Sequence, residues 1–308
     1  AIAFTTILIE KLQLYMQTFV KHILKIVLLL ILSASLLDFI YTKVYETSRE
    51  RNKVQAIING NTGNFDVVVL GSSRANNHIV TNEFTKEHMK AFNYGMSGSS
   101  LEESALLLQL MLEKKWAIKN VLLEVDLNVN SESYSDGTRA LFMPYFRNEI
   151  ISNYYQNIEN FNQLYYIPFY RFVAYETKIG AREMFFSLIR KKTNSLQNGG
   201  FYPLTNLGKN MKYDLSKYSP KENRNYKKIK DLCRMFKVNL IVITTPICKN
   251  TINRNYFKEV KKRYPEIHNF EDTVTDDKYF SSCGHMNVAG AIIFTNKIIA
   301  YLKESKKL

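Results

Sequence analysis

The sequence is poor in cysteine and acidic residues, and both shortages narrow the classes of protein that it can encode. It contains 3 cysteines in 308 residues, and the spacing of Cys233, Cys248 and Cys283 matches no metal-binding motif. It also lacks zinc-finger spacing, an RRM signature and a basic recognition helix, which argues against nucleic acid as a partner. Internal repeats and low-complexity tracts are absent as well. We therefore expect neither a bound metal nor a cofactor.

The deficit of acidic residues leaves the chain strongly basic. There are 42 Lys and Arg against 28 Asp and Glu, a formal net charge of +14. Such a balance favours anionic surroundings, such as acidic lipid or an acidic polymer. The alternative is that the lysines occupy solvated faces and carry no specific function. Apolar residues make up 46% of the chain, which is enough to build a globular core.

One long hydrophobic run is present, near the N-terminus. Residues 26–37 are apolar or small, and the run from 23 to 41 approaches the ~20 residues that span a bilayer. A cleaved signal peptide is one interpretation, favoured by Ser33, Ala34 and Ser35. A buried helix is another, although no regular polar face is present. We expect a retained membrane anchor over residues 1–42, followed by a charged and Gly/Asn-rich linker over 43–64.

The flanking charges give only limited information about orientation. Basic residues lie on both sides of the run: Lys11, Lys21 and Lys25 before it, and Lys43, Arg49, Arg51 and Lys53 after it. The count alone therefore does not decide topology. Lys21 and Lys25 lie closest to the run and favour a cytoplasmic N-terminus. The resulting hypothesis is a single-pass protein of the inner (cytoplasmic) membrane with an extracytoplasmic domain.

From residue 65 onward, short apolar segments alternate with helical patterns. Strands are expected over 66–70, 91–94, 120–126 and 239–245, and helices over 101–115, 220–236, 253–262 and 288–302. Continuous apolar strands separated by helices indicate a parallel sheet covered on both faces. We therefore predict a doubly wound α/β domain over 65–308, with its site at the carboxyl ends of the strands.

Residues 130–218 interrupt this alternation. The segment is rich in Tyr, Phe and Asn, and its spacing predicts helices over 148–164 and 168–190. We predict that it forms an aromatic, helical insertion into the α/β unit. Four interpretations remain open: a lid, a sugar-stacking surface, a partner interface, or rings that only pack the insertion onto the sheet.

Two short segments carry the residues best suited to chemistry. Gly71-Ser72-Ser73-Arg74 follows the first strand, and Gly284-His285-Met286-Asn287 precedes the last helix. A serine at a strand-to-helix turn has an exposed oxygen and nearby helix amides, but it needs a base to become a nucleophile. Ser73 and His285 are the candidate pair. The alternative is that both residues only cap helices.

The segment from Asp66 to Ile79 resembles the first block of SGNH/GDSL-type hydrolases, in the branch with Gly-Ser-Ser-Arg. Asn93-Tyr94-Gly95-Met96-Ser97-Gly98 resembles the second block, and residues 123–128 and 284–290 the remaining two. The resemblance implies a flavodoxin-like SGNH fold with Ser73 as nucleophile and His285 as base. It also implies an oxyanion hole formed by Ser73, Gly98 and Asn128.

One member of the family's pattern is missing. The pattern has an aspartate three residues before the histidine, where this chain has Ser282. In serine proteases, neutralising the orienting aspartate lowers turnover by ~10⁴, or about 5 kcal/mol of barrier. Ser282 or a backbone carbonyl could orient the imidazole instead, or Asp276 or Asp277 could reach it. Otherwise the site is inactive and only binds.

Three further expectations concern the surroundings of the site. Cys248 and Cys283 should both lie at the carboxyl rim of the sheet, so we predict a disulfide that braces the histidine loop. Cys233, on a helix, is expected to be free and buried. His78 is expected to hold the nucleophile turn and not to react.

The anchor and the Gly-Ser-Ser-Arg variant together resemble accessory proteins of cell-surface acylation, the D-alanyl-transfer and alginate-acetylation partners of membrane-bound O-acyltransferases. The resemblance implies an esterase or O-acyltransferase that modifies an envelope polysaccharide through a serine acyl-enzyme. Its implied partners are membrane lipid, a membrane-bound O-acyltransferase or another membrane-complex subunit, and the polysaccharide. The alternative is a catalytically degenerate domain that serves as a scaffold in a membrane complex.

Overall fold

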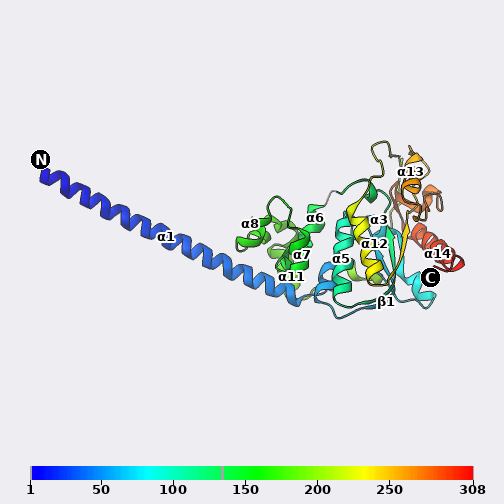
Figure 1. Cartoon of the computed structure of the whole chain (residues 1–308), viewed down its shortest axis with the longest axis horizontal. Helices are drawn as coiled ribbons and strands as arrows, with labels where there is room; N and C mark the ends of the chain where they lie inside the picture. Colours follow the sequence, from blue (N-terminus) through cyan, green and yellow to red (C-terminus); the bar gives the residue numbers. More distant parts are fainter. Residues whose placement is uncertain (1, 133–134, 308) are drawn as a thin grey trace.

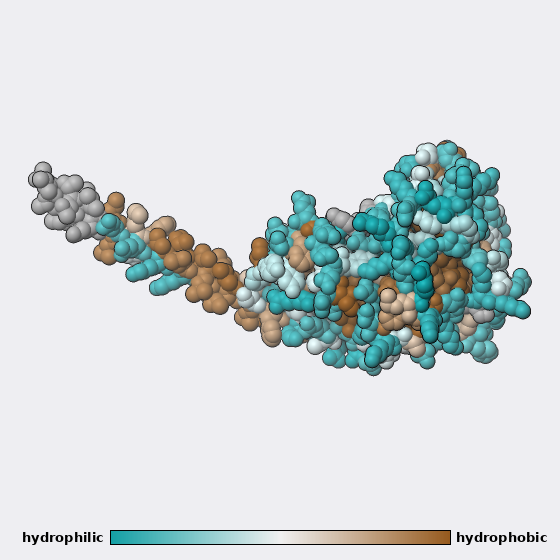
Figure 2. All heavy atoms as spheres, viewed as in Figure 1, coloured by the Kyte–Doolittle hydropathy of each residue, from teal (hydrophilic) through white to brown (hydrophobic). Residues whose placement is uncertain are grey.

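The structure is a computed structural model that describes residues 2–132 and 135–307. A long helix, α1 (Ile2–Thr47), projects from a mixed α/β body (Figure 1). Its 46 residues extend about 69 Å at 1.5 Å per residue. The part from Lys11 to Thr47 is long and apolar enough to cross a membrane. In Figure 2 the part of α1 nearer the body is mainly hydrophobic, whereas hydrophilic residues share the surface further out.

A four-stranded parallel sheet lies at the centre of the body. It contains β1 (Asn64–Leu70), β2 (Ala91–Asn93), β3 (Ala117–Glu124) and β5 (Asn239–Ile243) in the order β2-β1-β3-β5. The last four residues of β1 and of β3 are buried, as their apolar sequences predict. The predicted α/β class with a parallel sheet is confirmed. The order of strands reverses between β1 and β3, the position at which open α/β sheets bind ligands.

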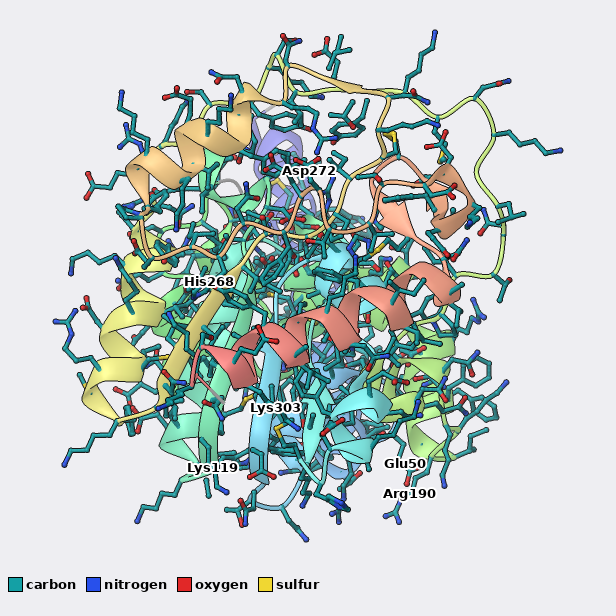
Figure 3. All side chains as sticks on the ribbon, turned by 90° about the vertical axis from the view of Figure 1, so that its right-hand side faces the viewer. Glu50, Lys119, Arg190, His268, Asp272 and Lys303 are labelled. Carbon is teal, nitrogen blue, oxygen red and sulfur yellow. A yellow bond between two sulfur atoms is a disulfide. The ribbon has the colours of Figure 1, made fainter. Side chains whose placement is uncertain are left out.

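Helices lie on both sides of this sheet. Helix α5 (Leu101–Glu113) packs beside α12 (Arg224–Met235) on one side (Figure 1). Helix α14 (Val288–Glu304) packs on α3 (Ser73–His78) and α4 (Thr81–Lys86) and crosses the other side, seen in front in Figure 3. The body also contains α13 (Asn255–Arg263) and η5 (Asp277–Tyr279). Two small sheets lie outside the central one, β4 (Tyr213–Asp214) with β6 (Thr251–Ile252) and β7 (Phe280–Ser282) with β8 (His285–Met286).

Residues 43–64, expected to be a linker, belong instead to the folded body. Helix α1 continues to Thr47, and α2 (Lys53–Asn59) follows it with Val54 and Ile57 in the core. Lys53 is also buried, because its Nζ donates to Asn76 Oδ1, the Gly95 carbonyl and the Gly200 carbonyl at 2.5–2.8 Å. Burial lowers the pKa of this amine to about 7. A lysine in a charged stretch normally indicates solvent, which is why the sequence suggested a linker.

The aromatic segment forms short helices in place of the two long ones expected. They are α6 (Asp136–Arg139), η2 (Ala140–Tyr145), α7 (Glu149–Tyr154), α8 (Phe161–Tyr166), α9 (Tyr170–Ala174), α10 (Glu176–Ile179) and α11 (Ala181–Leu188), with η1 (Asn128–Asn130) before them and η3 (Asn194–Leu196) and η4 (Asn198–Gly200) after. Phe169, at the start of the second expected helix, has φ of 65°, and non-helical backbone at Tyr175 and Gly180 divides the rest of that range into α9, α10 and α11. These helices lie beside the lower end of α1 (Figure 1).

Most aromatic rings of this segment pack against other side chains, which was one of the four interpretations of the sequence. Phe146, Tyr155 and Phe172 are buried. The ring of Phe172 lies 5.1 Å from that of Tyr41 and 6.0 Å from that of Tyr45, both on α1. The segment therefore attaches α1 to the body through aromatic contacts.

A buried ion pair reinforces this attachment. Asp38 of α1 accepts a hydrogen bond from Arg171 Nη2 at 3.0 Å and one from the Phe169 amide at 2.9 Å. Arg171 also donates to Thr42 Oγ1 at 2.7 Å, and Arg147 approaches Asp38 to 3.3 Å. Both side chains of the Asp38–Arg171 pair are almost fully buried. The end of α1 is therefore fixed to the body by charge-assisted hydrogen bonds in a dry environment.

We predict that Asp38→Ala destabilises the body by about 3–5 kcal/mol, because Arg171 is left buried without its counter-ion. Thermal unfolding in detergent measures the effect. Lys43→Ala is the matched control, since it breaks an exposed pair with Glu46 on the same helix and should cost ~1 kcal/mol or less. Equal effects from the two substitutions would contradict the assignment of Asp38 as the attachment point.

Candidate active site

The turn after β1 presents Ser73 at the start of a helix. The strand ends at Leu70, and Gly71 follows with φ of 141°. A Cβ at this glycine would lie 2.7 Å from Glu124 Oε2, so both the conformation and the space require glycine. Ser72 then caps α3, and Ser73 is the first residue of that helix. An amide at this position has no partner within the helix.

Hydrogen bonds distinguish the two adjacent serines. Ser72 Oγ donates to Glu124 Oε2 at 2.7 Å and accepts from the Arg74 amide at 3.2 Å. Its hydroxyl is thus committed to the turn. Ser73 Oγ instead lies 2.8 Å from Nε2 of His285. Only the second serine is therefore paired with a base.

His285 reaches Ser73 from a hairpin near the C-terminus. It belongs to β8, which pairs with β7 so that Ser282 lies opposite His285. Nδ1 of His285 lies 3.2 Å from Ser282 Oγ. With the Nδ1 proton donated to Ser282, Nε2 is free to accept the Ser73 hydroxyl proton. The two ring nitrogens thus have the roles required for base catalysis.

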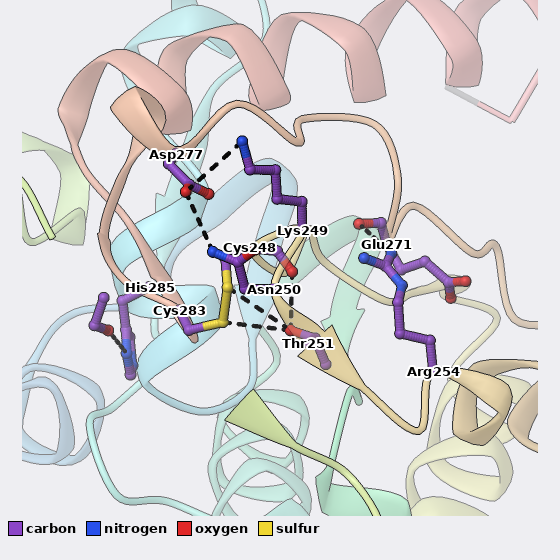
Figure 4. Close-up of a disulfide and its surroundings, with 10 residues drawn as sticks. Cys248, Lys249, Asn250, Thr251, Arg254, Glu271, Asp277, Cys283 and His285 are labelled. Atoms are coloured by element: carbon purple, nitrogen blue, oxygen red, sulfur yellow. Dashed lines mark hydrogen bonds and ion pairs between the residues drawn. A yellow bond between two sulfur atoms is a disulfide. The ribbon is translucent and has the colours of Figure 1, made fainter. Parts of the chain in front are cut away.

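The two aspartates proposed as orienting groups point elsewhere. Asp276 caps η5 and pairs with Lys278 at 2.9 Å. Asp277 contacts the amide of Asn250 at 3.4 Å and Lys249 at 4.0 Å (Figure 4). Ser282 is therefore the group that contacts Nδ1.

The electrostatic environment opposes protonation of His285. Burial lowers its pKa to about 4, and the positive charge of Arg74 acts in the same direction. In a Ser-His-Asp triad the carboxylate has the opposite effect, because it stabilises the imidazolium. The imidazole here is neutral at physiological pH and able to accept a proton.

A cavity of about 500 Å³ opens over this pair. Its wall includes Ser73, Gly98, Asn128, Ser282 and His285, and continues over Lys212 and Tyr213. Asn128 Nδ2 is buried and has no hydrogen-bond partner among the residues that the structure describes. An unpaired buried donor is costly unless a ligand satisfies it. Gly98 adopts φ of 80°, which suits glycine.

The structure also identifies residues that the sequence interpretation had not assigned. Arg74 pairs with Asp126 at 2.9 Å, and both are buried. Asp126 further accepts from the amide and the hydroxyl of Thr245, each at 2.6 Å. Glu124 Oε2 accepts from the amide and the hydroxyl of Ser72 at 2.8 and 2.7 Å. The signal in the sequence was the pair of acids that ends an otherwise apolar strand.

Burial changes how readily these acids bind a proton. Burial, followed by repulsion from Asp126, raises the pKa of Glu124 to about 7. Arg74 neutralises Asp126 directly, so Glu124 is the acid that holds a proton more readily. In the described part of the chain, no cluster of His, Cys, Asp or Glu has the arrangement of a metal site.

His78 connects this network to the hairpin of His285. Its Nδ1 donates to Thr245 Oγ1 at 2.9 Å, and its Nε2 accepts from the Met286 amide at 3.0 Å. Burial, followed by the positive charge of Arg74, lowers the pKa of His78 well below its usual value. A neutral ring is required for Nε2 to accept this bond.

The two cysteines at the rim are joined. Cys248 and Cys283 form a disulfide with a Cα–Cα distance of 4.7 Å (Figure 4). The Cys248 amide also donates to the Cys283 carbonyl at 3.1 Å, so the bridge ties the loop after β5 to the hairpin of His285. Cys233 is free and buried.

Comparison with known proteins adds little to this geometry. No family profile and no curated protein matches the chain. One matching solved structure, described as a platelet activating factor from Streptococcus pneumoniae, is 12% identical, with 91% of this chain and 97% of that chain covered and a TM-score of 0.30. A likeness of this level carries no argument about function, which must come from the site.

We predict that the Cys248→Ser/Cys283→Ser variant is less stable by about 2–4 kcal/mol, because the unfolded chain gains the entropy of a loop that the bridge had closed. Chemical denaturation measures the loss. A reductant should destabilise the parent protein to the same degree and leave the double variant unchanged. A reductant effect that persists in the double variant would contradict this explanation.

Proposed function

We propose that the protein is a membrane-anchored, extracytoplasmic serine esterase or O-acyltransferase of the SGNH type, built on a doubly wound sheet. The observation that carries this proposal is the 2.8 Å contact between Ser73 Oγ and His285 Nε2 at the carboxyl edge of the sheet. The strand order, with its reversal between β1 and β3, supports the fold assignment.

The proposed reaction has two steps. Ser73 Oγ attacks an ester carbonyl while His285 Nε2 takes the hydroxyl proton, and the tetrahedral intermediate collapses when His285 returns that proton to the leaving alcohol. Water or an acceptor hydroxyl then attacks the acyl-serine, with His285 again acting as base. Asn128 Nδ2 and the amides of Ser73 and Gly98 are the proposed donors to the oxyanion.

The proposed substrate is an envelope polysaccharide. The net charge of +14 favours an acidic polymer, and Lys212 and Tyr213 on the cavity wall offer a cation and a ring for sugar binding. We also propose that a membrane-bound O-acyltransferase is the partner that supplies or receives the acyl group.

A fluorophosphonate probe tests the nucleophile. We expect labelling of the full chain in membranes and complete loss of labelling in Ser73→Ala. Asn128→Ala should slow labelling by about 10²–10³-fold, because one oxyanion donor is removed. Ser216→Ala, at an exposed hydroxyl in the loop after β4, is the control and should label normally. Absence of labelling in the parent chain would favour the scaffold alternative.

The pH dependence tests the environment of His285. Since its pKa is lowered to about 4, the neutral base persists below the usual range for histidine. The rate of probe labelling should stay constant from neutral pH to about pH 5 and fall as the pH approaches 4, when the imidazole gains a proton. An inflection near 6.5 would contradict the proposed electrostatics.

Restoring the missing acid provides a complementary test. Ser282→Asp places a carboxylate beside Nδ1 of His285, which should stabilise the imidazolium and increase the labelling rate. The same substitution should raise the pH of the inflection. Ser282→Ala removes one hydrogen bond and should slow labelling by up to about tenfold. A slower Ser282→Asp variant would show that this position does not orient the base.

A further inference from the structure

The turn between α8 and α9 exposes apolar side chains that the proposed chemistry does not use. We call residues 166–169 the α8–α9 turn. Tyr166 is 71% exposed and Ile167 is 49% exposed, whereas the neighbouring Leu164 and Phe172 are buried. Val173, on the next helix, is 60% exposed. The turn therefore directs apolar groups outward from an otherwise packed segment.

A hydrogen bond and an aromatic contact fix the position of this turn along α1. The Phe169 amide donates to Asp38 at 2.9 Å, and the Phe169 ring lies 4.9 Å from that of Tyr41. The left-handed conformation of Phe169 is held by these contacts. The α8–α9 turn thus lies level with residues 38–41 of α1. Figure 1 shows α8 as the part of the insertion that extends furthest back along α1.

That level coincides with the end of the apolar surface of α1. Its exposed hydrophobic residues continue as far as Phe39, at 59% exposure, and Ile40, at 41%. Tyr41 and Tyr45 are already buried against the body. Because a span of ~20 residues ending here fills the hydrocarbon region, residues 38–41 lie at its boundary with the headgroups.

We propose that the α8–α9 turn is a second membrane contact, inserted into the headgroup–acyl boundary beside α1. This inference rests on the membrane anchor of the proposed function. Tyrosine and isoleucine suit this depth, since an aromatic ring with a hydroxyl is favoured at the interface. Arg147 approaches Asp38 to 3.3 Å at the same level and is 63% exposed, so it can also meet lipid phosphates.

Lipid is the occupant that the structure favours over a protein partner. The turn lies level with the last exposed apolar residues of α1, Phe39 and Ile40, and the apolar stretch that precedes them would be surrounded by acyl chains. The turn is also held rigidly to α1 by Asp38. Two contacts with one bilayer would prevent the body from rotating freely about the anchor and would fix the direction in which the site cavity faces.

Tryptophan fluorescence in lipid nanodiscs tests the proposal. The chain has 1 tryptophan, Trp116, which is buried, so parent fluorescence can be subtracted from that of each variant. Three variants of the full chain are compared: Ile167→Trp in the turn, Leu29→Trp within the span, and Met235→Trp on α12 as an exposed control. Each is measured with lipids that carry a nitroxide quencher near the headgroup or near the chain end.

We expect Ile167→Trp to show blue-shifted emission and stronger quenching by the shallow label than by the deep one. Leu29→Trp should respond most to the deep label. Met235→Trp, 72% exposed in the parent, should respond only to aqueous iodide. If Ile167→Trp behaves like Met235→Trp while Leu29→Trp is quenched by lipid, the second contact is refuted and the anchor stands. If Leu29→Trp is also unquenched by lipid, the anchor and this proposal both fail.

Probe labelling of Ser73 in the same nanodiscs separates this inference from the proposed chemistry. Labelling together with an iodide-accessible Ile167→Trp would leave the catalytic proposal intact and overturn the membrane contact. Protection of Ile167→Trp from both iodide and lipid quenchers would indicate a protein occupant and would likewise overturn it.

Discussion

The carboxylate of Asp126 is the group on which the geometry of the site depends. It accepts from Arg74 beside the nucleophile and from both the amide and hydroxyl of Thr245 after β5. Thr245 accepts from His78, and His78 accepts from the Met286 amide next to His285. One buried ion therefore connects the nucleophile turn with the hairpin that carries the base. Loss of a partner from such a buried charge strongly destabilises the folded protein. The folded state therefore favours the complete arrangement.

This network changes the electrostatics relative to a Ser-His-Asp triad. The negative charge is buried against Arg74 and does not contact the imidazole that faces Ser73. Ser282 orients that imidazole by a hydrogen bond but supplies no charge. In the proposed reaction the base would stay neutral over a wide pH range, but an imidazolium formed in the transition state would gain less stabilisation than in a triad. The physical consequence for that reaction would be slower turnover that persists at lower pH.

The sequence predicted those parts of the molecule that depend on local pattern. Buried strands read as apolar runs, and Gly71 with Ser73 could be recognised because a turn at a strand end needs particular residue types. The two long helices expected in the aromatic segment and the linker expected over 43–64 were wrong, because non-helical backbone at Phe169, Tyr175 and Gly180 divides that segment and Lys53 is buried through bonds to distant carbonyls. Such features depend on tertiary contacts that no local pattern contains. The Asp126 network was missed for the same reason, since its members come from four separate segments.

The missing acid at Ser282 can be understood through His78. In this chain the Asp126 carboxylate accepts from the Thr245 hydroxyl, and that hydroxyl contacts a second imidazole, that of His78. His78 in turn accepts from the Met286 amide and thereby holds the strand of His285. The acid therefore acts on the backbone position of the base and not on its charge. The disulfide from Cys283 to Cys248 restrains the same hairpin from its other side. A hairpin fixed at both sides can keep Nε2 at Ser73 without a carboxylate at Nδ1. In the proposed reaction, the absent carboxylate would lower the stabilisation of the imidazolium and leave the position of the base unchanged.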